Sequence, residues 1–224
     1  MHIGLIGGIG PAATEIYYRA IVRGFAAAGR TLELTIAHAD LPVMAANLRA
    51  GRAAEQAEIF AAHVAQLKAA GCDAAAVTSM GGHFCIAELE RMAPLPMLNA
   101  VPALDTFFAG QPAKRVGVLG TRLVMESGLY GVTSVEVIAP PHDRIDAVAE
   151  AYMAIAAAGV ATPEQCDFFR DAALSLHHDS GAEIVVLGGT DLSIAFTGAL
   201  PDVPIVDSAL IHADAIVRAA LADI

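Results

Sequence analysis

Short apolar runs alternate along the chain with longer segments in which apolar residues recur every three or four positions. The runs are typical of buried strands and the periodic segments of helices. The strands that we expect cover residues 2–7, 32–37, 74–77, a short stretch around 96, 114–119, 135–138, 184–187 and 205–206. The expected helices cover residues 12–28, 53–70, 85–91, 99–108, 143–158, 163–179 and 209–222. A loop at 41–42 is expected to lead to a polar, helix-compatible segment that contains Arg49 and Arg52, and a helix start is expected near 120–127. Strands that alternate with helices indicate parallel sheets and an α/β fold.

This pattern occurs twice. The stretches 71–83 and 181–193 each contain a glycine, an acidic residue, an apolar run and a small polar turn. Two further pairs of stretches match in the same order, 4–7 with 117–120 and 95–99 with 203–207. The members of each pair are about 110 residues apart, which indicates a duplicated structural unit.

The duplication predicts two pseudo-symmetric domains, each a parallel sheet flanked by helices. We expect the first domain to span residues 1–99 and 208–224, with the last helix packed back on the first half, and the second to span residues 100–207. In open α/β sheets, ligands bind outside the carboxyl ends of the strands. The polar turns at 78–83 and 189–191 are therefore expected to face each other across an active-site cleft between the domains.

Composition narrows the class of protein. Of the 224 residues 56% are apolar and 17% charged, which excludes disorder. The net charge of −11 and the absence of a basic run argue against a nucleic-acid partner. No apolar run approaches the ~18 residues of a membrane span, and the start has no basic region of a signal peptide, so we expect a cytoplasmic protein with no membrane partner. Cys72, Cys85 and Cys166 lack metal-ligand spacing, and we expect no metal.

The first glycine turn fits a dinucleotide-binding pattern, with Gly8, Gly10 and Ala13 after a strand and before a helix. Pro11 removes a backbone donor that a pyrophosphate would need. The nearest acid after the second strand, Asp40, lies about 30 residues beyond Gly8 rather than about 20. A tight turn that shapes a pocket for a smaller ligand is the favoured interpretation.

Residues 4–11 through Thr14, with Tyr17, Tyr18 and Arg19, resemble the opening of the aspartate/glutamate racemase family. Residues 120–125 with Tyr130 resemble the family's second-half turn, and residues 189–191 lie where its second catalytic turn should be. The resemblance covers nearly the whole chain. It implies two pseudo-symmetric α/β domains with the active site between them, and catalysis without a cofactor.

In that family two thiols face opposite sides of the substrate α-carbon, and one takes a proton while the other returns one. The resemblance implies that Ser79 stands in place of the first cysteine, with His83 retained nearby, and that Gly189 stands in place of the second. A serine hydroxyl is a poor base unless a neighbour activates it, and glycine transfers no proton. Two-sided transfer is then lost unless another residue substitutes, whereas one-sided transfer remains possible.

The candidate catalytic residues are Ser79, His83 and Asp191. His83 is either a general acid/base or a residue that orients the turn by hydrogen bonds. Asp191 either accepts a proton or holds Thr190. The candidate substrate-binding residues are Gly8, Ile9, Met80, Gly81, Thr121, Arg122, Gly189 and Thr190.

Arg122 and Cys85 need separate interpretation. Arg122 is either a bidentate carboxylate clamp or a solvated residue at a helix start. Cys85, on the helix that leaves the first turn, is interpreted as a small buried hydrophobic residue.

We therefore expect a cofactor-independent racemase or isomerase-family protein, a homodimer, that acts on a small carboxylate such as aspartate or glutamate. Two alternatives stay open. One is a protein that binds a small carboxylate and has lost catalysis, and the other is one-face chemistry such as decarboxylation or elimination.

Overall fold

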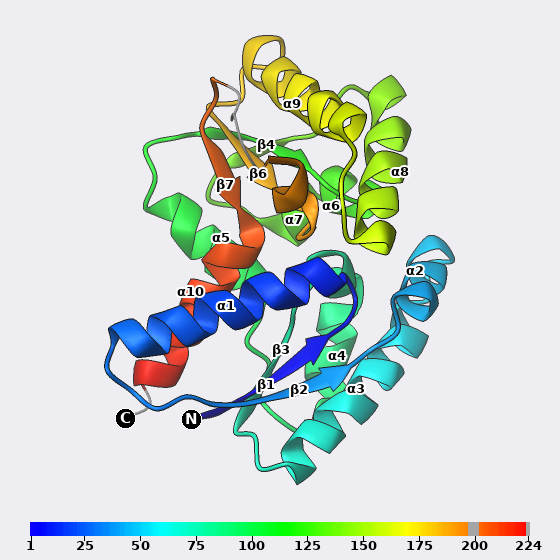
Figure 1. Ribbon diagram of the computed structural model, residues 1–224. Helices are drawn as coiled ribbons and strands as arrows, with labels where there is room; N and C mark the ends of the chain where they lie inside the picture. The colour runs from blue at the N-terminus through cyan, green and yellow to red at the C-terminus, as the bar shows by residue number, and fades with distance from the viewer. Residues whose placement is uncertain (197–201, 223–224) are drawn as a thin grey trace.

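Each half of the chain forms its own parallel sheet, and the two sheets lie one above the other in Figure 1. The computed structural model describes residues 1–196 and 202–222. The first sheet has the order β2 (Glu33–His38), β1 (His2–Gly7), β3 (Ala74–Val77). The second has the order β5 (Glu136–Ile138), β4 (Arg115–Leu119), β6 (Ile184–Leu187), β7 (Ile205–Asp207). All pairs are parallel, so the predicted α/β class with two parallel sheets is confirmed.

Helices flank both sheets, and most of their bounds lie within a few residues of the predicted ranges. The loop expected at 41–42 is wrong, because these residues form the first turn of a helix, where a proline is well accommodated. The helices are α1 (Pro11–Ala27), α2 (Leu41–Arg49), α3 (Ala53–Ala69), α4 (Ile86–Met92), α5 (Ala100–Ala109), α6 (Arg122–Glu126), α7 (Gly128–Gly131), α8 (His142–Ala158), α9 (Pro163–His178) and α10 (Ser208–Ala222). Two short 3₁₀ helices, η1 (Gly81–Cys85) and η2 (Leu192–Phe196), follow the two polar turns. Local sequence sets several of the starts: the Asp40 side chain caps α2, and Thr162 with Gln165 forms a capping box on α9.

The strand expected around Pro96 is wrong in extent. This stretch forms a single bridge between Ala75 and Met97, where Ala75 N–H donates to Pro96 O at 3.0 Å and Leu98 N–H donates to Ala75 O at 2.7 Å. The proline is not the cause, because Pro204 occupies the equivalent position in the second half and its carbonyl oxygen likewise accepts from Val185 N–H, at 2.8 Å. The counterpart in the second half, β7, pairs over three residues with β6.

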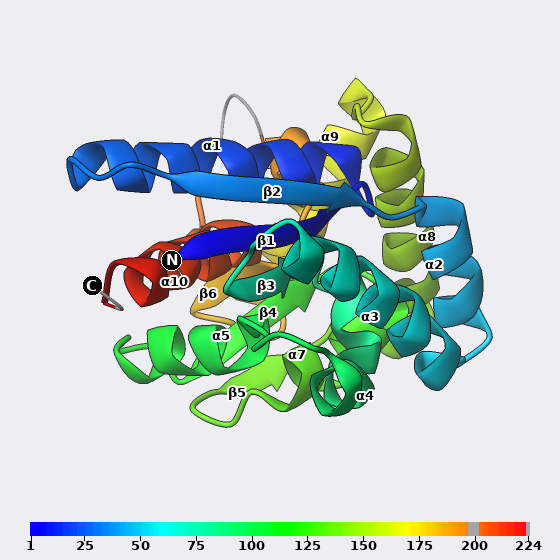
Figure 2. The same ribbon diagram turned by 90° about the horizontal axis from the view of Figure 1, so that it is seen from below.

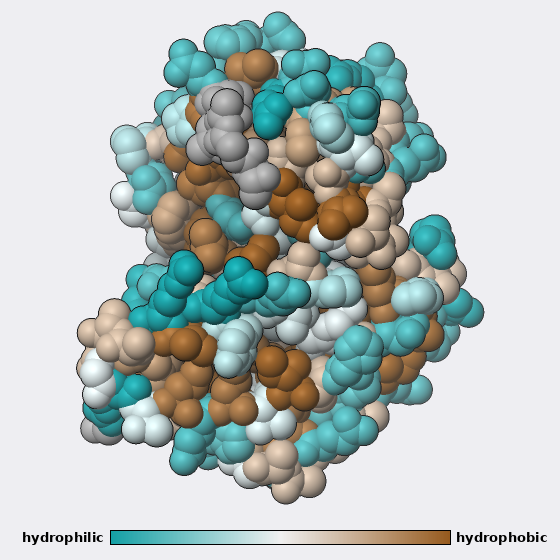
Figure 3. Space-filling view, viewed as in Figure 1, coloured by the Kyte–Doolittle hydropathy of each residue, from teal (hydrophilic) through white to brown (hydrophobic). Residues whose placement is uncertain are grey.

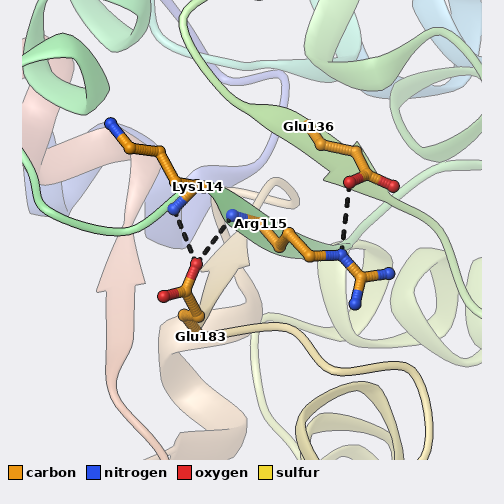
Figure 4. A network of polar contacts seen from close by, with 4 residues as sticks. All are labelled: Lys114, Arg115, Glu136 and Glu183. Atoms are coloured by element: carbon orange, nitrogen blue, oxygen red, sulfur yellow. Dashed lines mark hydrogen bonds and ion pairs between the residues drawn. The ribbon is translucent and has the colours of Figure 1, made fainter.

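The acidic residues of the repeat, Asp73 and Glu183, have the same structural role in the two halves. Glu183, just before β6, accepts hydrogen bonds from the backbone N–H groups of Lys114 at 2.6 Å and Arg115 at 2.9 Å (Figure 4). Asp73, just before β3, accepts one from His2 N–H at 2.6 Å. In the second half the network extends to β5, because Arg115 Nε donates to Glu136 at 3.2 Å. Each acid therefore fixes the start of the neighbouring strand in its own sheet.

Two helices, α5 and α10, cross from one half to the other. Both views of the ribbon show α10 beside α1 (Figures 1 and 2), and its Ala213, Ile216 and Ala220 join the core of the first sheet. In the opposite sense, Leu104 and Phe108 of α5 join the core of the second sheet. The predicted packing of the last helix on the first half is confirmed. The domain boundaries, 1–99 with 208–224 and 100–207, stay a prediction.

The surface carries a hydrophilic band over α1, seen toward the viewer in Figure 3. This helix holds an exposed ion pair between Arg19 and Glu15 at 3.2 Å. Among the described residues, no helix combines the length and the apolar character that crossing a membrane requires.

Candidate active site

The two polar turns meet at the amino-terminal end of α1. Thr14 Oγ1 lies 3.3 Å from Thr78 Oγ1 of the first turn. The neighbouring residue Ala13 donates its backbone N–H to Asp191 Oδ1 of the second turn at 3.0 Å. Because Ala13 and Thr14 are consecutive, the structure brings the two predicted turns together at one helix end.

Polar groups of the first turn are satisfied by nearby backbone. Thr78 Oγ1 donates to Ile6 O at 3.0 Å, and Ser79 Oγ accepts from Gly82 N–H at 3.3 Å. The Ser79 side chain is buried, with 1% of the residue exposed. These bonds fix the first turn between β3 and η1, and the turn held in this way is called the brace below.

His83 holds this brace with both ring nitrogens. Its Nδ1 lies 2.7 Å from the Ser79 carbonyl oxygen, so Nδ1 carries the hydrogen and donates it. Its Nε2 accepts from Ala100 N–H at 3.2 Å. Burial lowers the pKa of His83 to about 4, which keeps the ring neutral. Of the two roles open for His83, the geometry favours orienting the turn.

The second turn holds a buried acid. Asp191 is fully buried, and besides Ala13 its carboxylate has the Tyr152 hydroxyl as a donor at 3.5 Å. Burial raises the pKa of Asp191 to about 6, although its hydrogen bonds act in the opposite direction. The group can therefore exist in either protonation state near neutral pH.

The neighbouring Thr190 is also fully buried. Its hydroxyl is close enough to the Tyr152 phenol to favour ionisation of that phenol, but it forms no hydrogen bond of ordinary geometry to any described residue. An unpaired buried hydroxyl costs about 1–3 kcal/mol. Buried polar groups without a hydrogen bond are uncommon in folded proteins, which makes the Thr190 hydroxyl a candidate ligand-binding group.

The first glycine turn makes room for Asp191. Gly10 has a φ of 100°, and a Cβ built there would overlap the Asp191 carboxylate. Gly8, with a φ of 86°, donates its N–H to Thr14 Oγ1 at 2.9 Å and lies against the ring of His38. The helix end where a pyrophosphate would bind is occupied by the Asp191 carboxylate, which argues against the dinucleotide interpretation.

The other predicted contact residues lie in packed surroundings. Ile9 belongs to the core of the first sheet, and Met80 to the core of the second. Gly81 O accepts from the Tyr130 hydroxyl at 3.3 Å, and Tyr130 has the left-handed φ of 61° that is rare outside glycine. Thr121 caps α6 by accepting from Val124 N–H at 3.3 Å.

Arg122 lies at a cavity between the two halves. The cavity has a volume of about 560 Å³ and is lined from α2, α6 and α8. The Arg122 guanidinium already pairs with Glu126, at 2.6 Å, and with Asp146. This favours the interpretation of a helix-start surface residue over that of a carboxylate clamp. Arg49 lines the same cavity and forms no ion pair with another described residue.

Three buried residues and one half-buried residue near the turns were not among the candidate site residues named from the sequence. Tyr17 donates to His212 Nδ1 at 2.8 Å, and His212 Nε2 donates to Leu98 O at 2.8 Å. Burial raises the pKa of Asp207 to about 6, with a further contribution from the charge of Asp191. The fourth group is Tyr152. These residues come from α1, α8, β7 and α10, so no local spacing could have linked them.

No thiol substitutes for the residues of the turns. Burial raises the pKa of Cys85 to about 12, and the side chain donates to Gly82 O at 3.5 Å, so the thiol stays protonated. Over residues 1–196 and 202–222, no three His, Cys, Asp or Glu side chains are grouped so that they could hold a metal ion.

The sequence matches a known protein family, and the fold matches solved structures. A family model described as Asp/Glu/Hydantoin racemase matches residues 6–216. A crystal structure of a putative Asp/Glu racemase from Yersinia pestis is 26% identical, covers 99% of this chain and 100% of its own, and superposes with a TM-score of 0.82.

Two more distant structures show the same fold. An aspartate racemase homologue from Pyrococcus horikoshii OT3 is 22% identical, with a TM-score of 0.78 and coverage of 98% of this chain and 99% of its own. A glutamate racemase from Francisella tularensis in complex with D-glutamate is 15% identical, with a TM-score of 0.63 and coverage of 99% of this chain and 81% of its own.

Proposed function

The chain belongs to the Asp/Glu/Hydantoin racemase family, and on that premise we propose that it catalyses proton transfer at the α-carbon of a small carboxylate such as aspartate or glutamate. Asp191 is the group that takes and returns the proton. The observation that carries the proposal is the buried Asp191 carboxyl, with its pKa raised to about 6, next to the Thr190 hydroxyl, which lies near the Tyr152 phenol and has no hydrogen bond of ordinary geometry among the described residues.

The pKa of Asp191 suits this role. A general acid/base works best when its pKa lies near the operating pH, and perturbed values gather at functional sites. The other two candidates fit less well. Both nitrogens of His83 are already hydrogen-bonded, and its pKa is lowered to about 4. His83 contacts the Ser79 carbonyl rather than its hydroxyl, so it does not activate Ser79 as a nucleophile or base.

The proposed step has one proton and one face. The substrate Cα–H bond breaks, the proton goes to the Asp191 carboxylate, and the electron pair spreads into the substrate carboxylate. Thr190 donates its hydroxyl hydrogen to that developing negative charge. Asp191 then returns a proton to the carbon from the side on which it took one, while Ser79 and His83 hold the first turn in place.

Substrate has to reach a closed site. Ser79, Thr190 and Asp191 are each at most 1% exposed. Thr121 lines the 560 Å³ cavity, and its methyl group lies beside Gly81 of the first turn. We propose that substrate enters from this side when the two halves separate, a movement of the kind that closes many active sites.

The test is exchange of the α-hydrogen in D₂O, followed by ¹H NMR for aspartate, glutamate and a panel of small mono- and dicarboxylates. At least one acid should lose its α-proton signal in the presence of the protein. Asp191→Asn should slow that exchange by about 10²–10⁴-fold, because the amide cannot accept the proton. Exchange that survives at the wild-type rate in Asp191→Asn would remove Asp191 from the mechanism.

A second candidate function is binding without catalysis. It is favoured by Gly189, which carries no side chain, and by the tight closure of the first turn. A thermal-shift panel with the same acids distinguishes the two functions, because a ligand that binds the folded state raises the Tm whether or not it reacts. Stabilisation by an acid that shows no exchange would support binding alone.

Three further properties are also proposals. We propose a homodimer that acts without a cofactor in the cytoplasm. Sedimentation measures the first property, and activity of extensively dialysed protein measures the second.

A further inference from the structure

The space beside Gly189 is filled by the ring of Tyr152. A Cβ built on Gly189 would lie 2.6 Å from Tyr152 Cδ2, 2.8 Å from its Cζ and closer still to its Cε2. Side-chain Cβ atoms in proteins essentially never approach another heavy atom within 3.0 Å. Residue 189 can therefore carry no side chain while Tyr152 keeps this position.

Tyr152 comes from α8 and is 3% exposed. Burial raises the pKa of its phenol well above the ordinary value, and the charge of Asp191 raises it further. The phenol is therefore a hydrogen-bond donor at neutral pH and not a base. Its hydroxyl lies 3.5 Å from Asp191 Oδ2, on the carboxyl group that the proposed function uses.

We propose that Tyr152 and Gly189 form a matched pair in which Tyr152 takes the place of a side chain at residue 189 and holds the Asp191 carboxyl. The ring fills the volume above Gly189, and the hydroxyl positions Asp191 Oδ2. Tyr152 is thus a positioning residue. The inference has two parts. The packing half, in which the ring fills the space beside Gly189, is independent of the proposed function. The positioning half, in which the hydroxyl holds Asp191, affects catalysis only if the proposed function holds.

One consequence concerns stereochemistry. With the ring over Gly189 and the first turn braced, Asp191 is the acid/base that the proposed function uses, so a proton is removed and returned from one side of the carbon. The substrate should then exchange its α-hydrogen for deuterium with retained configuration, rather than racemise.

The packing half is tested by thermal unfolding of four proteins. Gly189→Ala alone should lower the Tm by about 5 °C or more, because the methyl group overlaps the ring. In the Tyr152→Ala background the same change should lower the Tm by less than about 1 °C, because the ring is gone. Equal losses in both backgrounds would overturn the matched pair.

Tyr152→Phe is the matched control, because it keeps the ring and removes only the hydroxyl. Gly189→Ala should be as damaging in the Phe background as in the wild type. If Tyr152→Ala fails to fold, Tyr152→Val, which also removes the ring, takes its place in the comparison.

The positioning half is tested by the pKa of Asp191, read from its ¹³C carboxyl signal during a pH titration. A hydrogen bond to a carboxylate favours the charged form and lowers the pKa. Tyr152→Phe should therefore raise the pKa of Asp191 above the wild-type value. An unchanged pKa would overturn the positioning role. Neither test needs a substrate, so a failure here is distinct from a failure to find α-hydrogen exchange.

Discussion

The two polar turns have the same origin in the sequence repeat and differ in how their polar groups are satisfied. In the first turn, Thr78, Ser79 and His83 all bond to nearby backbone. In the second turn, the Thr190 hydroxyl has no partner of ordinary geometry among the described residues, and Asp191 has a raised pKa. A satisfied turn stabilises a fold, whereas an unsatisfied buried turn carries a cost that binding a ligand would relieve.

Under the proposed function, the difference indicates which of the two duplicated turns retains chemistry. Strand, turn and short 3₁₀ helix occur in both halves, and so does the acid that fixes the start of the neighbouring strand. Only the second turn keeps an acidic group at the shared helix end, next to Ala13. The first turn stabilises the fold, and the second turn supplies a titratable carboxyl group, Asp191.

The largest expected effect on stability is at His83. His83→Ala removes both hydrogen bonds of the ring and leaves a buried cavity, so we expect a loss of about 3–4 kcal/mol in the free energy of unfolding. His178→Ala, at an exposed histidine, is the control and should change it by less than about 0.5 kcal/mol. Urea unfolding measures both. A small loss at His83 would mean that the first turn is not a brace.

The next effect is a dependence of stability on pH that belongs to the second turn. Burial raises the pKa of Asp191 from 3.8 to about 6, so the folded protein binds this proton more tightly than the unfolded chain does. The stabilisation from Asp191 is complete below pH 3.8 and is lost as the pH rises through about 6. The change amounts to about 3 kcal/mol.

The measurement compares Asp191→Asn with the wild type by urea unfolding at several pH values. The difference in unfolding free energy should move in favour of the variant by about 3 kcal/mol between about pH 4 and pH 7. The wild-type curve alone is less informative. The pKa values of His83 and His212 are lowered to about 4 and about 3, so their contribution is lost as the pH falls below 6.5. A constant difference between variant and wild type would contradict the raised pKa of Asp191.

A smaller effect is expected at the first glycine turn. Gly10→Ala places a methyl group against the Asp191 carboxylate at a left-handed φ of 100°, and we expect a loss of about 2–3 kcal/mol. Gly29→Ala is a matched control, because Gly29 also has a left-handed φ, 64°, but has no atom within 4 Å of a Cβ. It should cost about 1 kcal/mol. Equal losses at the two glycines would show that Asp191 does not fill the space beside Gly10.

The smallest effect is expected at Arg122. Its side chain is 42% exposed and is paired with two exposed carboxylates, so Arg122→Ala should change stability by less than about 1 kcal/mol. It should also leave the KM for the substrate within about threefold of the wild type. A rise in KM of tenfold or more would instead support the interpretation of Arg122 as a carboxylate clamp.

Most of the fold was predictable because it follows from local patterns. Apolar runs and helical periodicity gave the strands and helices, and the repeat gave the two sheets. The stretch around Pro96 was expected to be a strand and forms one bridge, whereas its counterpart, which also contains a proline, Pro204, leads into a three-residue strand. Sequence periodicity indicates which positions are buried, but it does not show over how many residues two strands pair.

The site was predictable only in outline. The turns could be placed at the ends of central strands, and Ser79, His83 and Asp191 could be named. Their ranking depends on which groups are satisfied, and that depends on contacts across the chain such as Ala13 with Asp191. Tyr152 lies 37 residues before Gly189 in the sequence and on a different element, so no motif linked them.

Under the proposed function, the proton-transfer group lies in the second turn and the brace in the first. The measurement that tests it most directly is α-hydrogen exchange in D₂O for the acid found by the panel, run in parallel on Ser79→Ala and Asp191→Asn. Ser79→Ala should exchange within about threefold of the wild type, and Asp191→Asn about 10²–10⁴-fold more slowly. Loss of exchange in Ser79→Ala, with wild-type exchange in Asp191→Asn, would contradict the account.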